Sequence, residues 1–129
     1  MAAIKGKDTK PELIVRKGLH ARGLRYRLHR KSLPGSPDIV LPSRRVVVFV
    51  NGCFWHAHEG CRDFKLPKTD QSRWKAKLEG NRQRDAANQK ALKSLDWRVI
   101  VVWECNLRGK SAGEVSQFLD ELAKTILFG

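Results

Sequence analysis

The fold class of this chain is set by the six residues RVVVFV, Arg45 to Val50. A continuous β-branched run of this length is typical of a strand that is buried on both faces of a sheet. A second valine-rich run, Trp97 to Trp103, has the same character. Because strands of this kind need helices on both faces of their sheet, the two runs predict an α/β domain.

Three helices are predicted around the two buried strands. Their ranges are residues 9–22, about 69–95 and 111–129. The first and third begin with the spacing of a capping box, Thr9 with Glu12 and Ser111 with Glu114. Gly80 lies in the middle of the second helix, where a glycine permits a kink or a break.

Two short strands are predicted between the first helix and the first buried strand. They cover residues 25–29 and 38–41, and a turn rich in proline and glycine separates them at residues 33–37. The resulting order is helix, three strands, helix, strand, helix. This order predicts a single domain over residues 1–129, with a mixed sheet, helices on both faces and a basic arm at residues 1–8.

The charge of the chain predicts a polyanionic partner. There are 26 Lys and Arg residues against 13 Asp and Glu residues, which gives a net charge of +13. Residues 111–129 contain three acidic residues and one Lys, a balance of −2, so residues 1–110 carry +15. Nucleic acid is the first candidate for such a surface, and a solvated basic face that aids solubility is the alternative.

No stretch of the sequence predicts a membrane segment. The longest apolar run, Val46 to Val50, is far shorter than the ~20 residues of a spanning helix. The first ten residues have no apolar core of the signal-peptide kind. We therefore expect a cytoplasmic protein that associates with the nucleoid and has no membrane partner.

The cysteines and one histidine predict a zinc site. An odd count of three cysteines argues against a disulfide framework. Cys53 follows one buried strand and Cys105 follows the other, while His58 and Cys61 come shortly after Cys53. If the two strands are parallel neighbours, these four side chains meet at one end of the sheet and offer the donors that structural zinc prefers. The alternative is two buried thiols and an exposed loop histidine.

Asp38 and His56 are candidates for hydrolytic chemistry. A carboxylate at the mouth of a buried strand is costly unless it is paired or bound to metal, and nucleases use such an Asp to hold magnesium. The acidic-x-Lys pair that usually accompanies it is missing from Val48-Phe49-Val50. An imidazole can act as a general base near neutral pH, so His56 could supply the missing base. The alternatives are a turn residue for Asp38 and a bystander for His56.

Three aromatic residues predict contact with stacked bases. Phe54 and Trp55 lie on the loop after the first buried strand, and Trp74 lies among the cations of the second helix. Rings set among cations can wedge between base pairs while the cations hold phosphates. The alternative is packing against the sheet, which is what we expect of Trp97 and Trp103.

Several linked motifs resemble those of the very short patch repair endonucleases. They are LPGSPD at 33–38, VFVNGCFWH at 48–56, VWEC at 102–105, KDTKPE at 7–12 and the helical segment 74–85. The resemblance covers roughly residues 5–110. It implies a monomeric, restriction-endonuclease-like α/β domain with a structural zinc. It also implies a bacterial enzyme that nicks double-stranded DNA 5′ to the thymine of a T:G mismatch left by deamination of 5-methylcytosine.

The resemblance also implies roles for individual residues. Asp38 and the backbone carbonyl of Val50 would bind magnesium, His56 would be the base, and Glu12 would hold metal-bound water. Zinc would be held by Cys53, His58, Cys61 and Cys105. The DNA wedge would be formed by Phe54, Trp55 and Trp74, while Lys77 and Asn81 would contact the mismatched pair.

Two departures from the family pattern are visible, and the first removes an imidazole near the phosphate, which leaves auxiliary acid chemistry open. Val50-Asn51 stands where the best-known pattern has Thr-His, and the loop between His58 and Cys61 is one residue longer. One alternative is a nicking enzyme of the same fold with a different or broader DNA target. Others are a zinc-stabilised DNA-binding module without catalysis and a zinc redox protein, although the chain has no Cys-x-x-Cys pair. Repair-protein partners are possible, but the sequence does not identify them.

Overall fold

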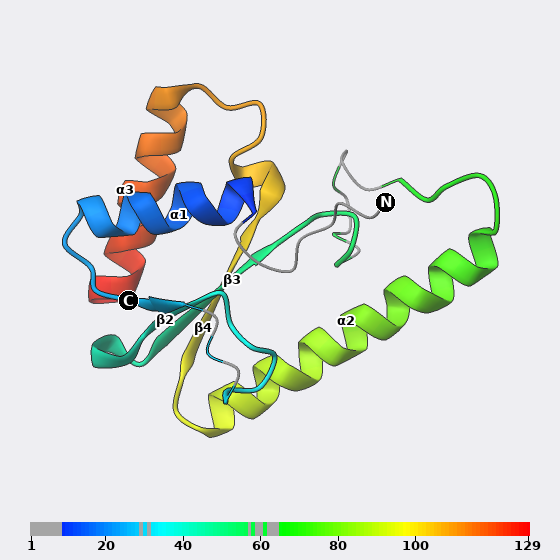
Figure 1. Ribbon diagram of the computed structural model, residues 1–129, viewed down its shortest axis with the longest axis horizontal. Coiled ribbons are helices and arrows are strands. Elements are labelled where there is room, and N and C mark those ends of the chain that lie inside the picture. Colours follow the sequence, from blue (N-terminus) through cyan, green and yellow to red (C-terminus); the bar gives the residue numbers. More distant parts are fainter. Residues whose placement is uncertain (1–8, 29, 31, 57, 59–60, 62–64) are drawn as a thin grey trace.

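The computed structural model describes residues 9–28, 30, 32–56, 58, 61 and 65–129, so the expected basic arm at 1–8 lies outside the described residues. A mixed four-stranded sheet forms the centre of the molecule (Figure 1). Its strands, in spatial order, are β1 (Arg27–Leu28), β2 (Ile39–Leu41), β3 (Val46–Asn51) and β4 (Arg98–Trp103). The first two pairings are antiparallel, and β3 and β4 are parallel as the zinc prediction requires.

Helices cover both faces of this sheet (Figure 1). On one face lie α1 (Lys10–Ala21) and α3 (Ala112–Phe128), and on the other lies α2 (Gln71–Ser94). Val46 and Val48 belong to the core on the α1 and α3 side, whereas Val47 belongs to the core on the α2 side. All three valines are 0% exposed, which confirms that this strand is buried on both faces.

The packing of α1 on α3 fixes the position of the first helix over the sheet. Gly18 allows the close approach, since a Cβ built there would lie 2.5 Å from Leu119 Cδ1. Arg22 joins the two helices, because its Nε donates to Asp120 Oδ1 at 2.8 Å and its other nitrogens donate to the carbonyls of Gly18 and Ser116. The start of α1 is therefore held at a defined place near the ends of the strands.

The predicted helix boundaries are confirmed, with two differences inside them. The helix α2 runs without interruption through Gly80, because one glycine inside a helix costs only about 1 kcal/mol. At Ser111 the complete capping box forms with Glu114. At Thr9 only half of the box forms, since the Thr9 hydroxyl accepts from the Glu12 N–H while the Glu12 carboxylate pairs with Arg16.

The remaining elements are short. Two 3-10 turns, Pro42–Arg44 and Glu104–Asn106, follow β2 and β4. The strand expected at 25–29 is reduced to Arg27–Leu28, and His29 lies outside the described residues. None of the described helices is both long enough and apolar enough to cross a lipid bilayer.

Candidate active site and metal site

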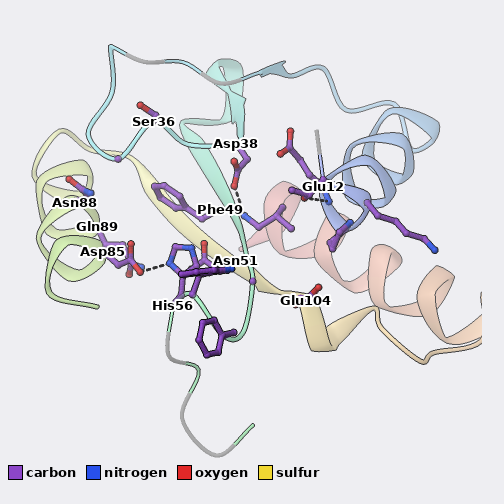
Figure 2. Close-up of a pocket in the computed structure, with 18 of the residues that line it drawn as sticks. Glu12, Ser36, Asp38, Phe49, Asn51, His56, Asp85, Asn88, Gln89 and Glu104 are labelled. Atoms are coloured by element: carbon purple, nitrogen blue, oxygen red, sulfur yellow. Dashed lines mark hydrogen bonds and ion pairs between the residues drawn. The ribbon is translucent and has the colours of Figure 1, made fainter. Parts of the chain in front are cut away.

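A pocket of about 860 Å³ opens beside the ends of β2 and β3 (Figure 2). Residues from distant parts of the sequence line it: Glu12 from α1, Asp38 before β2, His56 after β3 and Asp85 from α2. Glu12 comes from α1 on one side of the pocket, and Asp85 comes from α2 on the other (Figure 2). The predicted candidates Glu12, Asp38, Val50 and His56 therefore share one cavity.

Asp38 is held at the mouth of the sheet by the neighbouring strand. Ile39 pairs with Val48 across the antiparallel ladder, so the residue before Ile39 reaches the end of β3. There the Asp38 carboxylate accepts the Val50 N–H at 2.7 Å. A backbone hydrogen bond of this kind stabilises a charged carboxylate and fixes its direction.

Glu12 is buried at the start of α1. Its side chain is 2% exposed and lies 3.4 Å from Arg16 Nη1, one helical turn on. The pairing offsets part of the cost of burying the charge, and the positive end of the helix dipole adds to this effect. Glu12 therefore contributes a buried carboxylate to the wall of the pocket.

His56 is paired with an acid that the sequence analysis missed. His56 Nδ1 lies 2.6 Å from Asp85 Oδ2, and both side chains are about one-third exposed. A carboxylate at Nδ1 favours the tautomer with its proton on Nδ1, which leaves Nε2 able to accept a proton. A sequence signal for Asp85 exists, because it and Glu79 are the two acids of the otherwise cationic α2.

Several further pocket residues were not predicted, among them four with charged or amide side chains. Glu104 and Arg108 form an ion pair at the end of β4 and line the same cavity. Asn88 and Gln89 extend the polar wall of α2 beyond Asp85 (Figure 2). Side chains such as these can contact a polar substrate, but their residue types carry no distinctive sequence pattern.

The predicted metal ligands form one cluster. The donor atoms of Cys53, His58, Cys61 and Cys105 all lie within 4.8 Å of one another. The parallel register explains the meeting, since Asn51 pairs with Trp103 and the two cysteines lie two residues beyond those positions. Ligands of a tetrahedral zinc are roughly 3.5–4 Å apart, so this donor set fits zinc with a small contraction.

The electrostatics of the cluster also suit a metal. Burial raises the pKa of the Cys53 thiol to about 12; side-chain hydrogen bonds with Cys105 and Cys61 also raise it, while a backbone hydrogen bond of Cys105 lowers it. Cys105 Sγ lies 3.6 Å from His58 Nδ1. A divalent cation would lower the pKa of these thiols and neutralise the thiolates, which burial alone disfavours. None of the three cysteines, all of which are described, forms a disulfide.

The predicted DNA contacts gather beside the pocket. The rings of Phe54, Trp55 and Trp74 form one cluster, with centroids 4.9 to 5.9 Å apart. Lys77 Nζ lies 5.5 Å from the centroid of the Trp55 ring. Asn81 donates from Nδ2 to the Trp55 carbonyl at 3.0 Å. The three half-buried rings therefore contact one another, and Lys77 and Asn81 both lie against Trp55.

Trp97 and Trp103 differ from each other, although both were expected to pack against the sheet. Trp97 does so and belongs to the core on the α2 side. Trp103 instead stacks on the imidazole of His58, with ring centroids 3.9 Å apart and planes 2° apart. The difference arises because Trp103 is the last residue of β4, where the strand ends at the metal-ligand cluster.

Comparisons with known proteins agree on a single family. The family model described as DNA mismatch endonuclease Vsr matches residues 1–62. A type II nicking enzyme, V.XorIIP of Xanthomonas oryzae pv. oryzae, is 54% identical over 114 residues, covering 88% of this chain and 83% of that protein. The type II nicking enzyme V.NmeAIP of Neisseria meningitidis is 44% identical, covering 86% and 79%.

The DNA mismatch endonuclease Vsr of Escherichia coli is 44% identical over 110 residues, covering 85% of this chain and 70% of that protein. The chain belongs to the Vsr family of DNA mismatch endonucleases.

Proposed function

We propose that this DNA endonuclease nicks one strand of a duplex 5′ to the thymine of a T:G mismatch, by magnesium-dependent hydrolysis of a phosphodiester bond. The observation that carries the proposal is the shared pocket. Two carboxylates, Glu12 and Asp38, and an acid-paired imidazole, His56, converge there from separate elements. A DNA-binding module without catalysis would need neither the buried acid nor the His56–Asp85 pair.

In the proposed mechanism His56 takes a proton from the attacking water at Nε2. Asp85 keeps the Nδ1 proton in place and stabilises the imidazolium that forms, since its carboxylate lies 2.6 Å away. Asp85 is thus a positioning residue. The arrangement is the general-base pair used by many hydrolases, here open to solvent on the pocket side.

Asp38 and the Val50 carbonyl are the proposed magnesium ligands. The Val50 N–H is directed at Asp38, and in an antiparallel ladder the N–H and C=O of one residue face the same neighbour. Oxygen donors of this kind suit Mg²⁺. When bound, the ion would neutralise charge that develops on the phosphate, and Glu12 would orient water nearby. The residue after Val50 is a histidine in the family pattern, whereas this chain has Asn51. Asn51 is 5% exposed, and its amide has no proton to give at neutral pH.

Zinc is the proposed occupant of the Cys53, His58, Cys61 and Cys105 cluster. Its role is structural, because all four positions of a tetrahedral ion would be filled by protein. Holding both ends of the segment from Cys53 to Cys61 would fix Phe54, Trp55 and His56 between them. The general base and the aromatic cluster would therefore keep one geometry.

Mismatch preference is proposed to come from the aromatic cluster. Inserting rings into a base stack costs a few kcal/mol, and a weakly paired step costs less to distort than a matched one. Lys77 and Asn81 lie against Trp55 and would meet the distorted pair once the rings enter the duplex. The exposed cations of α2 would hold the flanking phosphates.

A labelled duplex set that contains each mismatch, with and without magnesium, tests the proposal. We expect nicking only with magnesium and fastest at T:G, and an Asp38→Ala variant that binds DNA but does not cut. Nicking of matched duplexes at the same rate as T:G duplexes would favour a broader target. The 54% identical relative, which is named a type II nicking enzyme, is the reason to test that alternative. If the protein binds every duplex but cleaves none, it would instead be a DNA-binding module without catalysis.

A further inference from the structure

Trp103 lies between the proposed active site and the metal-ligand cluster. It is the last residue of β4 and pairs with Asn51 on β3. Its backbone N–H donates to Asn106 Oδ1 at 2.8 Å, which fixes the point at which the strand ends. The backbone of Trp103 is therefore fixed by the sheet, while its indole can still turn about the side-chain bonds.

The indole of Trp103 contacts two imidazoles that have different proposed roles. His58, a metal ligand, stacks face to face on it, with centroids 3.9 Å apart. His56, the proposed base, meets it at an angle of 75° with centroids 6.4 Å apart. One aromatic side chain thus joins the two sites.

This contact supplies a restraint that the Asp85 hydrogen bond lacks. A hydrogen bond at Nδ1 limits rotation of the His56 ring about its Cβ–Cγ bond, but the angular tolerance of the bond still lets the plane of the ring rock. A flat neighbour at an edge-to-face distance restricts the turn. Because proton abstraction at Nε2 depends on the direction of that nitrogen, the restraint bears on the rate.

We propose that Trp103 is a positioning residue that couples the orientation of His56 to metal occupancy of the Cys53, His58, Cys61 and Cys105 cluster. This inference rests on the roles given to His56 and to the cluster under the proposed function. A metal bound at His58 fixes the plane of that imidazole, the stacked indole follows that plane, and His56 follows the indole. Groups behind metal ligands commonly act in this way.

Ring-current shifts in the zinc-loaded full chain test the coupling without any cleavage. The histidines carry ¹³C labels, and replacing each in turn by Gln assigns the Cε1–H signals. We expect the His58 signal upfield in the wild type, and we expect zinc removal by a chelator to move both the His58 and His56 signals. In Trp103→Leu the upfield shift is lost and His56 moves. An unchanged His56 signal in both experiments would overturn the proposal.

Nicking kinetics of two variants give the second test. Trp103→Leu is expected to lower the single-turnover rate about 10- to 100-fold, as loss of a group behind a metal ligand does, with duplex affinity within about twofold. Trp103→Phe keeps a stacking ring and is expected to recover most of the rate. Tyr26→Leu is the matched control, because Tyr26 makes a similar edge contact with His20, 6.5 Å away, outside the pocket.

The outcomes separate the two proposals. If Trp103→Leu fails to retain zinc, the zinc-bound Trp103→Phe variant is the deciding test. A Phe variant whose His56 signal and nicking rate match those of the zinc-free Leu variant would overturn the proposed coupling through Trp103 stacking. A wild-type rate in a zinc-loaded Leu variant overturns it as well. Failure of the wild-type protein to nick T:G duplexes would instead contradict the proposed function. The ring-current experiment would still test the coupling, because it does not depend on cleavage.

Discussion

The pairing of His56 with Asp85 leads to a quantitative prediction for Asp85→Asn. The substitution keeps the shape of the side chain but removes its charge, and an amide can donate its N–H to His56 Nδ1 and so favour the wrong tautomer. A hydrogen bond to a charged group contributes about 1.5–3 kcal/mol. At about 1.4 kcal/mol per tenfold change in rate, its loss lowers single-turnover nicking roughly 10- to 150-fold. The lower end applies better here, because Asp85 is 31% exposed and solvent screens its charge.

The assay measures nicking of a T:G duplex with enzyme in excess, so that product release does not mask the chemical step. Glu79→Gln is the matched control, since Glu79 is the other acid of α2 and pairs only with the exposed cation Arg82 among the contacts described, at 3.5 Å. Its rate is expected to equal that of the wild type. Combining Asp85→Asn with His56→Gln should lower the rate no further than His56→Gln does. Additive losses, or an Asp85→Asn rate within threefold of the wild type, would refute the role of the pair.

Three other perturbations follow from the structure. Gly18→Ala places a Cβ 2.5 Å from Leu119 Cδ1 and is expected to lower the free energy of unfolding by about 1–3 kcal/mol, measured by urea unfolding against Gly113→Ala, where the same Cβ meets nothing closer than 4.0 Å. Chelation of zinc is expected to lower the Tm and slow nicking, and adding zinc but not magnesium should restore both. An unchanged Tm would contradict a structural role for zinc. The Ser111 hydrogen bonds lower the pKa of Glu114 below its ordinary value of 4.5, so its stabilisation is present above pH 4.5 and lost as pH falls below it. The Tm difference between wild type and Glu114→Gln should therefore shrink from pH 7 to pH 3. A constant difference would show that the charge of Glu114 does not stabilise the start of α3.

The sheet was largely predictable because its central strands carry an unambiguous pattern. The five consecutive β-branched or aromatic residues at 46–50 leave no polar face, and the structure places alternate valines in two different cores. The strand expected at 25–29 shows the opposite case. Both residues of Arg27–Leu28 are exposed at the edge of the sheet, so burial contributes little to defining its ends.

The metal-ligand cluster was predictable for a related reason. Cys53 and Cys105 each follow a buried strand, and parallel strands end at the same edge of a sheet. Asp85 and Trp103 were not assigned a site role in advance. Asp85 is one of two acids on the otherwise cationic α2, but its spacing in the sequence does not reveal that it faces His56. Trp103 continues an apolar run and does not stand out from its neighbours.

Local pattern was sufficient for the identity of the elements, the basic charge of residues 1–110 and the residue types able to bind zinc or magnesium, because each depends on side chains that are close in the chain. The partners of those side chains depend on strand register and helix placement. The register of β3 against β4 brings the cysteines together, and the seat of α2 on the sheet brings Asp85 to His56. Contacts between residues this far apart follow from the packing of the whole core, and so they became visible only in three dimensions.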